Sequence, residues 1–586
     1  MEFNRHVCGG RIEELTGKKA KLLPIDIYFR TLGFYKIARQ EYEKSSPDER
    51  LALDSFAEGV NAYISNRRPE ELSLNYTILG LTGVKFKIET WSPLDTLTIA
   101  KLIAWDFGLS RDIELTRVKL YAVLGSEMAE QFLVPHPWPY NYHPTIIGLA
   151  DVHQLEKVSA SILQPTVEKF EANYADITHH VFNDPAPDIS SVTGNLEGIG
   201  SNSWVATGKI TQSGGSLLAD DLHMGLPMPS FWYEIDLHCP DNEPGHPFHV
   251  AGFTLSSNPL VIVGHNNDIA WGNTNVYPDV NDQYSVKVNP DNSLQYEWNG
   301  KWRNMNVHHE SISFGDGKPS INIRIRATHL GPIINENKYD AKTGSGSGFN
   351  NKDPRAQRWT ALEPGHITRA VIGMNKARNW NEFRAALKYL QVPAQSFLFA
   401  DKQGNIGYQM SGKIPIRPKN FTGQVTTPGW SEKYEWKGYL PYNMLPHAYN
   451  PARGFIVAAN QEVAPAEYYE FLQRQLGPDV NGNFGSKYNR WTYEYRAKRI
   501  YDLIKELAPN TIDSFQKIQG DNKYLSADEV LPYLTNLKFG SQELTDARNW
   551  MLKWDRRFDE NNPHACLYAE FWLKMMKNTS RTNWVT

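Results

Sequence analysis

The spacing of the apolar residues changes near residue 200, and this change constrains the fold of the 586-residue chain more than any other feature. Residues 1–160 mainly follow the 3.6-residue period of helices. One helix is predicted to begin where Ser46 and Glu49 can form a capping box, and another to end at Gly125. The apolar residues of the first helix that we expect to face a core are Leu53, Phe56, Val60 and Tyr63.

Beyond residue 201 the pattern favours strands. SWVAT, LVIVG, DQYSVKV and SINIRIRAT are short β-rich runs, and Asn299-Gly300 is typical of a hairpin turn. Helical spacing returns in NWNEFRAALKYL and in YRAKRIYDLIKEL. Residues 161–200 are rich in turn formers, which indicates an exposed linker. Helices, then strands, then helices predict a layered α+β protein.

Composition excludes several classes of protein. The formal net charge is −4, and no block of like charge marks a tail, so we expect no nucleic-acid partner. No apolar run reaches the ~18–20 residues that span a bilayer, and the first ten residues lack the apolar centre of a signal peptide. Cys8, Cys239 and Cys566 are too few and too scattered for a disulfide framework or a zinc site.

Common catalytic motifs are also absent from the sequence. It contains no phosphate-binding Gly-x-x-x-x-Gly-Lys-Ser/Thr loop, no His-Glu-x-x-His zinc helix and no Gly-x-Ser-x-Gly nucleophile elbow. A Gly-Ser pair alone usually marks a turn. The run Ser201-Asn202-Ser203-Trp204, with His223 downstream, therefore needs support from the rest of the chain.

That support comes from an ordered set of sequence blocks. GSNSWVATGKITQSGGSLLADDLHMGLP is followed by NPLVIVGHNNDIAWGNTNVYPDVNDQY, and then by HLGPIIN, RWTALEP, SFLFADKQGNIGYQMSGKIPIR, GFIVAANQ and YRAKRI. In content and order these blocks resemble the penicillin acylase family of N-terminal-nucleophile (Ntn) hydrolases. The resemblance extends from about Arg5 to at least Leu503.

The resemblance implies a four-layer αββα sandwich assembled from two chains of one precursor. Residues 1–160 resemble the helical α-chain region, 161–200 the spacer before the processing site, and 201–586 the β-chain region. Family chains begin with strands that are missing here, and they usually continue beyond TSRTNWVT, so the sandwich is expected to be incomplete at both ends. The family also implies a periplasmic or extracellular protein.

Ser201 is the nucleophile that the resemblance implies. A serine hydroxyl needs a base to accept its proton, and in this family the base is the serine's own α-amine, freed when the peptide bond after Gly200 is cut. An α-amine has a pKa of about 7.7–8.0, close to the working pH that favours general-base catalysis. Gly200 suits such a cut because glycine adopts strained backbone angles at little steric cost.

The other catalytic roles come from the matching blocks. His223 stands where the family has a residue that orients the serine amine, directly or through water. The side-chain amide of Asn460 and the backbone N–H of Asn275, or of the adjacent Val276, would stabilise the oxyanion. Arg496 matches an arginine near the nucleophile. Taken singly, each of these residues has an ordinary structural explanation, such as a turn asparagine or a solvated arginine.

A structural calcium site is also implied, with one Ca²⁺ per heterodimer. Hard oxygen ligands from distant segments suit this ion, although an isolated Asp-x-x-Asp is more often a turn. The residues that match the family's site are Glu114, Asp279, Asn281 and Asp282.

Two functions follow from these features. The first is an autoprocessing amidase that removes an acyl group from an amine, such as a β-lactam or an N-acyl-homoserine lactone. The second is a non-catalytic homologue or an inactive fragment of the same fold. A metal-assisted hydrolase has little support from ligand spacing. Met224 and the region Trp105–Phe107 are expected to contact the acyl group.

Overall fold

The computed structural model describes most of the chain. It leaves out one long segment and several shorter ones. These are residues 18–21, 82, 84–86, 109, 133–144, 160–199, 225–229, 240–247, 338, 341–344, 347, 350–351, 420, 482–490, 493 and 583–586. The predicted linker at 161–200 therefore lies outside the described residues, except for Gly200.

The described part of residues 1–160 is helical, as the sequence predicts. The capping box of α5 is present, with the Ser46 backbone N–H donating to Glu49 and the Glu49 N–H donating to the Ser46 hydroxyl. The helices are α1 (Glu2–Cys8), α2 (Ile12–Thr16), α3 (Leu23–Leu32), α4 (Phe34–Lys44), α5 (Pro47–Ile64), α6 (Pro69–Leu72), α7 (Leu74–Leu81), α8 (Pro93–Phe107), α9 (Ser110–Phe132) and α10 (Leu149–Ser159).

Tyr63 and Gly125 test two of the predictions made for these helices. Leu53 is buried, but Tyr63 is 54% exposed, so its expected core position is wrong. At 3.6 residues per turn Tyr63 lies about 80° around α5 from Leu53, beyond the face that packs. Gly125 does interrupt the second helix, because it has φ 72° and ψ 168° and divides α9 into two parts.

The rest of the described chain mixes strands with helices. Asn299-Gly300 forms the predicted hairpin between β9 and β10, with both residues in the left-handed region. The strands are β1 (Gly200–Ala206), β2 (Leu217–His223), β3 (Trp232–His238), β4 (His249–Leu255), β5 (Val263–Asn266), β6 (Ile269–Asn275), β7 (Asn281–Ser285), β8 (Val288–Asn289), β9 (Asn292–Trp298), β10 (Lys301–Asn304), β11 (Asn306–Ile312), β12 (Ile321–Thr328), β13 (Gly331–Pro332), β14 (Tyr339–Asp340), β15 (Ser345–Gly346), β16 (Arg355–Trp359), β17 (Gln395–Asp401), β18 (Ile406–Ser411), β19 (Arg417–Pro418), β20 (Thr427–Pro428), β21 (His447–Tyr449), β22 (Phe455–Ala458) and β23 (Val480–Asn481). The helices of this part are α12 (Ile367–Lys376), α13 (Trp380–Leu387), α14 (Ala466–Leu476), α15 (Tyr495–Glu506), α16 (Ile512–Gln519), α17 (Leu525–Leu534), α18 (Gln542–Leu552) and α19 (Pro563–Thr582).

One predicted strand is placed wrongly. The run LVIVG begins at Leu260, but β5 begins only at Val263. Val261 is buried, and the side-chain amide of Asn375 bonds both its N–H and its carbonyl. The Asn375 side chain thus bonds the backbone groups of Val261 that a neighbouring strand would otherwise bond. The first residues of LVIVG therefore form a buried connection and not a strand.

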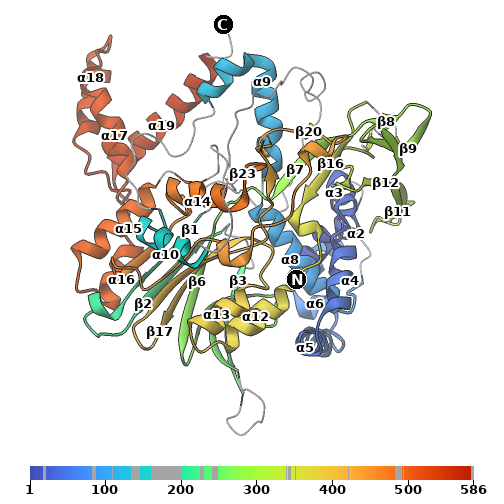
Figure 1. The fold of residues 1–586 in the computed structure, drawn as a ribbon, viewed down its shortest axis with the longest axis horizontal. Helices are drawn as coiled ribbons and strands as arrows, with labels where there is room; N and C mark the ends of the chain where they lie inside the picture. The colour runs from blue at the N-terminus through green and yellow to red at the C-terminus, as the bar shows by residue number, and fades with distance from the viewer. Residues whose placement is uncertain are drawn as a thin grey trace.

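Two sheets form the centre of the molecule (Figure 1). The larger has the strand order β21-β18-β17-β6-β5-β4-β3, and the smaller has the order β2-β1-β22. The strands β1 and β2 pack against β6 and β17 of the larger sheet. Because side chains alternate along a strand, β1 presents Ser201, Ser203 and Val205 to one side and Trp204 and Ala206 to the other.

Helices pack on the far side of each sheet. Trp204 and Val457 of the smaller sheet share an apolar cluster with Ile504 of α15 and Phe515 of α16. Phe397 of the larger sheet shares another with residues of α12 and α13, among them Met374, Phe383 and Leu387. Val205 belongs to a third cluster, which includes Leu398 of β17. Ser201 therefore lies on the side of β1 that faces the larger sheet.

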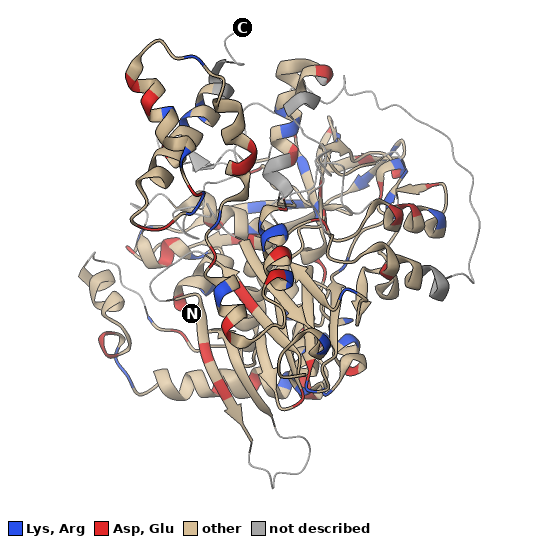
Figure 2. Ribbon diagram, turned by 90° about the vertical axis from the view of Figure 1, so that its left-hand side faces the viewer, with Lys and Arg blue, Asp and Glu red and all other residues tan. Residues whose placement is uncertain are grey.

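The helices α17 to α19 have a core of their own, built around Leu531, Trp554 and Tyr568. They stand away from the two sheets in Figure 1. Acidic residues (red) and basic residues (blue) are interspersed along the ribbon in Figure 2. None of the helices in the described chain is both long and apolar enough to cross a membrane.

Candidate active site

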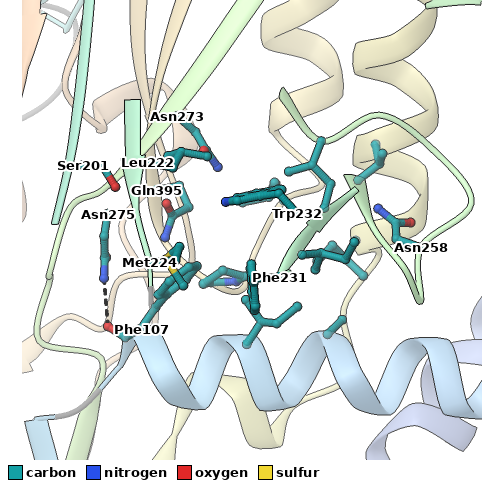
Figure 3. A pocket seen from close by; sticks show the side chains of 18 of the residues that line it. Phe107, Ser201, Leu222, Met224, Phe231, Trp232, Asn258, Asn273, Asn275 and Gln395 are labelled. Carbon is teal, nitrogen blue, oxygen red and sulfur yellow. Dashed lines mark hydrogen bonds between the residues drawn. The ribbon is translucent and has the colours of Figure 1, made fainter. Parts of the chain in front are cut away.

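Ser201 occupies the second position of β1, the middle strand of the smaller sheet. It pairs with Leu222 of β2 and is 6% exposed. Its side chain borders a pocket that lies between this sheet, the larger sheet and the helices α8 and α12 (Figure 3). The strand pairing fixes the backbone of Ser201, and the pocket gives its hydroxyl an open side.

Asn460 connects the backbone of Ser201 to the larger sheet. Its Oδ1 accepts the Ser201 N–H at 2.7 Å, and its Nδ2 donates to the Asn275 carbonyl at 2.7 Å. Asn460 follows β22 with φ 64°, a left-handed conformation that asparagine tolerates better than most residues. Since a side-chain amide has two N–H donors, one remains to bond a developing oxyanion.

Arg496 of α15 holds the same strand from the other side. Its Nη1 donates to the Ser201 carbonyl at 2.7 Å and to Asn202 Oδ1 at 2.6 Å, and its Nη2 donates to Asn460 Oδ1 at 2.9 Å. Burial lowers the pKa of Arg496, and Tyr277 and Asp221 act against this effect. A guanidinium stays protonated in proteins, so a positive charge lies beside the Gly200–Ser201 segment.

Gly200 is required for space and not for an unusual backbone angle. Its φ lies outside the positive region, so the expected backbone strain is absent. A Cβ at this position would come within 3.0 Å of Arg496 Nη2 and 3.2 Å of Asn460 Oδ1. Any larger residue would push these two side chains away from Ser201.

Asn275 lies at the site, at the end of β6. Its carbonyl accepts from Asn460, its Nδ2 donates to the Phe107 carbonyl at 3.2 Å, and its Oδ1 accepts from the Tyr277 N–H at 3.2 Å. These contacts hold the end of β6 beside Ser201. The oxyanion role of the N–H of Asn275, or of Val276, remains a prediction.

His223 is close to Ser201 in the sheet, but its side chain lies on the other face. It pairs with Gly200, one register position away from the Ser201–Leu222 pair. Its Nε2 lies 3.0 Å from Asp221 Oδ2 and 3.4 Å from Asn202 Nδ2. Because side chains alternate along β1 and β2, the side chains of His223, Asp221 and Asn202 all project from the face of the smaller sheet that packs against α15 and α16. The imidazole therefore lies on the opposite face of β1 from the Ser201 side chain, and its role in orienting the Ser201 amine, directly or through water, stays a prediction.

The pocket beside Ser201 is mostly apolar. Phe107 and Met224 line it, as the sequence predicts, whereas Trp105 donates to the Tyr28 hydroxyl at 3.2 Å. Apart from Ser201 and Asn275, sequence reasoning missed its polar members, such as Asn258, Asn273 and Gln395, because the folding of distant segments brings them together. The other described lining residues are Thr96, Leu97, Ala100, Ile103, Gly200, Leu222, Phe231, Trp232, Leu255, Ser257, Asn258, Ile262, Asn273, Asn275, Tyr277, Ile367, Thr368, Val371, Met374, Leu390, Pro393, Gln395 and Phe397.

The residues predicted to bind calcium lie together in a second buried site. Glu114 of α9 accepts the Gln283 N–H at 3.1 Å, and Asp279, Asn281 and Asp282 are all buried. Burial, and then the charges of Asp282 and Asp279, raise the pKa of Glu114 well above its usual range. Burial also raises the pKa of Asp279 to about 7, with Arg417 acting against it.

Arg417, which sequence reasoning missed, binds two of these residues. Its Nε lies 2.9 Å from Asp282 Oδ2, its Nη2 lies 3.2 Å from Asp282 Oδ1, and its Nη2 lies 3.2 Å from Asp279 Oδ1. Trp436 Nε1 also donates to Asp282. Both oxygens of Asp282 thus have partners, and no three His, Cys, Asp or Glu side chains of the described chain are arranged to hold a metal.

Two buried oxygens of the acidic site, Glu114 Oε1 and Asn281 Oδ1, have no hydrogen-bond partner among the described residues, and Asp279 Oδ1 has only its ion pair with Arg417. These are hard donors from separate segments, as Ca²⁺ prefers. In donor chemistry the site therefore fits calcium through Glu114, Asp279 and Asn281, with Asp282 bound to Arg417.

Comparisons with known proteins show which family the sequence matches. The sequence model of the penicillin amidase family matches residues 1–584. An acyl-homoserine lactone acylase QuiP of Pseudomonas fluorescens (strain Pf0-1) is 27% identical over 85% of this chain and 54% of its own length. The penicillin acylase 2 proenzyme of Pseudomonas sp. (strain SE83) is 23% identical over 97% of this chain and 66% of its own length.

A solved structure was also found, that of a thermostable penicillin G acylase from Alcaligenes faecalis. It is 25% identical and covers 61% of this chain and 59% of its own, with a TM-score of 0.48. The chain spans just over half the length of the first of the curated relatives that it matches. On the match of the family model to residues 1–584, the chain belongs to the penicillin amidase family.

Proposed function

We propose that the protein is an acylase that hydrolyses an amide bond with Ser201, after cutting its own chain between Gly200 and Ser201. The observation that carries this proposal is the hydrogen bond from the Ser201 N–H to Asn460 Oδ1, at the edge of an apolar pocket. Arg496 bonds both Ser201 and Asn460, so the three residues form one unit.

The first reaction would be the self-cleavage. In the uncut chain the Ser201 nitrogen is an amide and has no basic lone pair. The Ser201 hydroxyl would attack the carbonyl carbon of Gly200, so that a C–O bond forms, the C–N bond breaks and the hydroxyl proton passes to the nitrogen. Water would then hydrolyse the ester, leaving the Gly200 carboxylate and a free Ser201 amine.

Turnover would use the freed amine as the base. It would accept the hydroxyl proton while Ser201 Oγ attacks the substrate carbonyl, and it would return the proton to the departing amine. The second N–H of Asn460, together with the predicted backbone N–H of Asn275 or Val276, would stabilise the oxyanion. Water would hydrolyse the resulting acyl ester and regenerate Ser201.

The pocket favours an apolar acyl group. Phe107 and Ile103 of α8, Leu255 of β4 and Val371 of α12 line it, and burying apolar surface there would contribute about 25 cal/mol per Å². The relatives are named for penicillin and for acyl-homoserine lactones. We infer for this chain an apolar acyl group linked to a small amine of that kind.

The same proposal covers the organisation of the protein. We infer an α-chain region over 1–160, a spacer over 161–200 and a β-chain region over 201–586, which would form a heterodimer after processing. The packing of α15 and α16, the two sheets, and α12 and α13 supports a four-layer αββα sandwich. One Ca²⁺ held by Glu114, Asp279 and Asn281 would join α9 to β7. A periplasmic or extracellular location is proposed from the family resemblance.

Intact mass and N-terminal sequencing test the proposal. We expect the wild type to contain a chain that begins at Ser201, and Ser201→Ala to remain uncut and inactive, because both the hydroxyl and the freed amine are lost. Ser203→Ala is the matched control. Ser203 lies on the same face of β1, is fully buried and donates to the Ala219 carbonyl, so this variant should still cleave.

Two results would contradict the proposal. An uncut wild type that still hydrolyses amides would exclude the N-terminal serine mechanism. A wild type that is both uncut and inactive would favour a non-catalytic member of the family.

A further inference from the structure

Two histidines face each other across β3 and β4, where the register pairs His238 with His249. The Cys239 N–H donates to the Phe248 carbonyl at 2.8 Å, and hydrogen-bonded and non-hydrogen-bonded pairs alternate along an antiparallel ladder. His238 and His249 therefore form a non-hydrogen-bonded pair, the kind in which side chains approach most closely. Their Nδ1 atoms lie 3.0 Å apart, and their ring centroids lie 5.1 Å apart.

A carboxylate accompanies this pair. Asp236 lies two positions before His238 on the same face of β3, and its Oδ1 is 3.0 Å from His238 Nε2. The negative charge favours a proton on Nε2, and a neutral imidazole with its proton there has a lone pair on Nδ1. Carboxylates commonly stand behind metal-bound histidines, where they fix the ring and make the imidazole more basic. Asp236 therefore prepares His238 Nδ1 to donate an electron pair.

The separation of the two Nδ1 atoms suits a metal ion. Bonds from imidazole nitrogen to zinc are about 2.0–2.1 Å long, and two such bonds at a right angle place their nitrogens about 2.8–3.0 Å apart. The observed separation is 3.0 Å, across a hydrogen bond that His238 accepts when its proton is on Nε2. On binding, His249 would shift its proton from Nδ1 to Nε2, so that both Nδ1 lone pairs could bond the ion.

The donor atoms select the class of ion. Imidazole suits Cu²⁺, Ni²⁺ and Zn²⁺, whereas Ca²⁺ prefers oxygen ligands. Right-angled ligands are typical of Cu²⁺ and Ni²⁺, and Cu²⁺ binds a given site most tightly among the first-row divalent ions. The side chains of His238 and Asp236 are 63% and 62% exposed, so water can complete the coordination. The described residues contain no group of three His, Cys, Asp or Glu that could hold a metal, which limits the protein ligands to two nitrogens.

We propose that His238 and His249 bind a divalent transition-metal ion, Cu²⁺ in preference to Ni²⁺ and Zn²⁺, with Asp236 as a positioning residue. This site goes beyond the proposed acylase function and does not depend on it. His238 and Trp232 stand at opposite ends of the seven-residue strand β3, roughly 20 Å apart, and Trp232 lines the pocket beside Ser201. Because β3 is the last strand of the larger sheet, the ion would connect an edge strand to its neighbour.

Copper titration tests the proposal. We would measure Cu²⁺ binding by calorimetry, with excess calcium present to occupy the acidic site. Asp236→Ala should weaken the tightest copper site by about 10- to 100-fold, and Asp236→Glu, which keeps a carboxylate, should bind more tightly than Asp236→Ala. His238→Gln and His249→Gln each remove one of two ligands, so each should weaken the site at least as much as Asp236→Ala.

A spectroscopic measurement separates ligand loss from a structural effect. Electron paramagnetic resonance of wild-type protein with one equivalent of Cu²⁺ should show coupling to two imidazole nitrogens, and each histidine variant should lose one of them. The melting temperature without copper should be the same in the wild type and the variants, because the replaced side chains are on the surface.

Two variants serve as controls. His153→Gln removes an exposed histidine of α10, and Cys239→Ser removes the thiol next to His238, which alternation places on the other face of β3. Both should bind copper at the tightest site as the wild type does.

The outcomes separate this inference from the acylase proposal. Equal copper affinity in the wild type, His238→Gln and His249→Gln would overturn the inference, as would a loss of affinity in His153→Gln as large as in those variants. Copper binding that needs both histidines would support it even in a chain that neither cleaves itself nor hydrolyses amides.

Discussion

The serine site and the acidic site are both buried, but they satisfy their polar groups in opposite ways. Around Ser201, the side chains of Asn460 and Arg496 bond the Ser201 backbone, the Asn202 side chain and each other at 2.6–2.9 Å. Around Asp279, two buried oxygens, Glu114 Oε1 and Asn281 Oδ1, have no hydrogen-bond partner among the described residues, and Arg417 and Arg117 supply nearby positive charge. In the serine site the polar side chains bond one another, whereas the acidic site leaves buried oxygens without hydrogen bonds in the described structure.

Under the proposed function, this difference would separate a pre-organised catalytic unit from a charge-dependent joint between segments. Catalysis needs donors that are aimed before the substrate arrives, because reorientation during the reaction would raise the barrier. A joint between α9 and β7 can instead depend on an ion, because binding of the ion to the folded state adds stability. The predictions below test whether the two sites behave so differently.

The largest expected effect is that of Arg417→Met on stability. Removing the guanidinium leaves Asp282 and Asp279 buried without their partner, and breaking a buried ion pair costs about 3–5 kcal/mol. Urea unfolding should show this loss. The control is Lys402→Met, since the Lys402–Asp268 pair has its lysine side chain 60% exposed and should contribute at most about 1 kcal/mol. Equal losses in both variants would mean that Arg417 is not needed to balance the acidic site.

Asn460→Ala should act on rate more than on stability. Loss of one oxyanion donor lowers kcat by about 100- to 1,000-fold, and the bond to the Ser201 nitrogen is lost as well. Asn450→Ala is the matched control, because Asn450 is also an asparagine with positive φ, at 48°, but bonds Ile406 away from the site. A similar fall of kcat in both variants would indicate a general effect of replacing a left-handed asparagine.

Calcium should stabilise the acidic site and leave the serine site unaffected. At a free calcium concentration 100 times its Kd, the ion would add about 2.7 kcal/mol to the free energy of unfolding. Melting with calcium and with chelator measures this difference. Glu114→Gln should remove most of the response, because it removes one of the charges that attract the ion. A melting temperature that chelator does not change, with no calcium found by elemental analysis, would refute the site.

Asp220 is a third buried carboxyl group, and we expect it to keep its proton in the folded chain. Replacing it should have the smallest of the predicted effects on stability. Both of its carboxyl oxygens are buried, and the carboxyl group packs against the backbone of Gly272. Burial raises its pKa to about 8, with Ser203 and the Asn273 backbone acting against it. The folded chain thus keeps a proton that the unfolded chain releases above pH 3.8, so stability should fall as pH rises toward 8 and then level off.

Asp220→Asn should remove this slope and add about 2 kcal/mol at pH 8.5, within the range for relieving a buried unsatisfied group. Urea unfolding at pH 5 and pH 8.5 measures both quantities. Asp221→Asn is the neighbouring control, because His223 lowers the pKa of Asp221, and its stabilising effect should already be complete at pH 5. Parallel pH slopes in wild type and Asp220→Asn would contradict the prediction.

Several features of the fold could be predicted from the sequence because short-range physics decides them. The capping box at Ser46, the helix break at Gly125 and the hairpin at Asn299-Gly300 depend on residues within a few positions of one another. The run LVIVG at Leu260 was misassigned because an apolar run is compatible with a strand or with a buried connection. Only the distant Asn375 decides between them.

The residues of the serine site could be predicted from the sequence, but their arrangement in space could not. Ser201, Asn460 and Arg496 were identified through ordered motifs, and they meet although 259 and 295 positions separate Ser201 from the other two. The side chain of His223 faces away because the β1–β2 register places it opposite Gly200. That register is set across a long connection, where no local pattern reveals which face a residue takes.

The sequence by itself determined the change from helical to strand spacing, the family and the identity of the nucleophile candidate, because these depend on residue types in a fixed order. Only the tertiary structure decided which polar groups are satisfied. Arg417 binds Asp282, and Gly200 leaves room for Arg496. The physical reason is that burial and hydrogen bonding depend on neighbours in space, and for these residues the neighbours come from distant strands and helices.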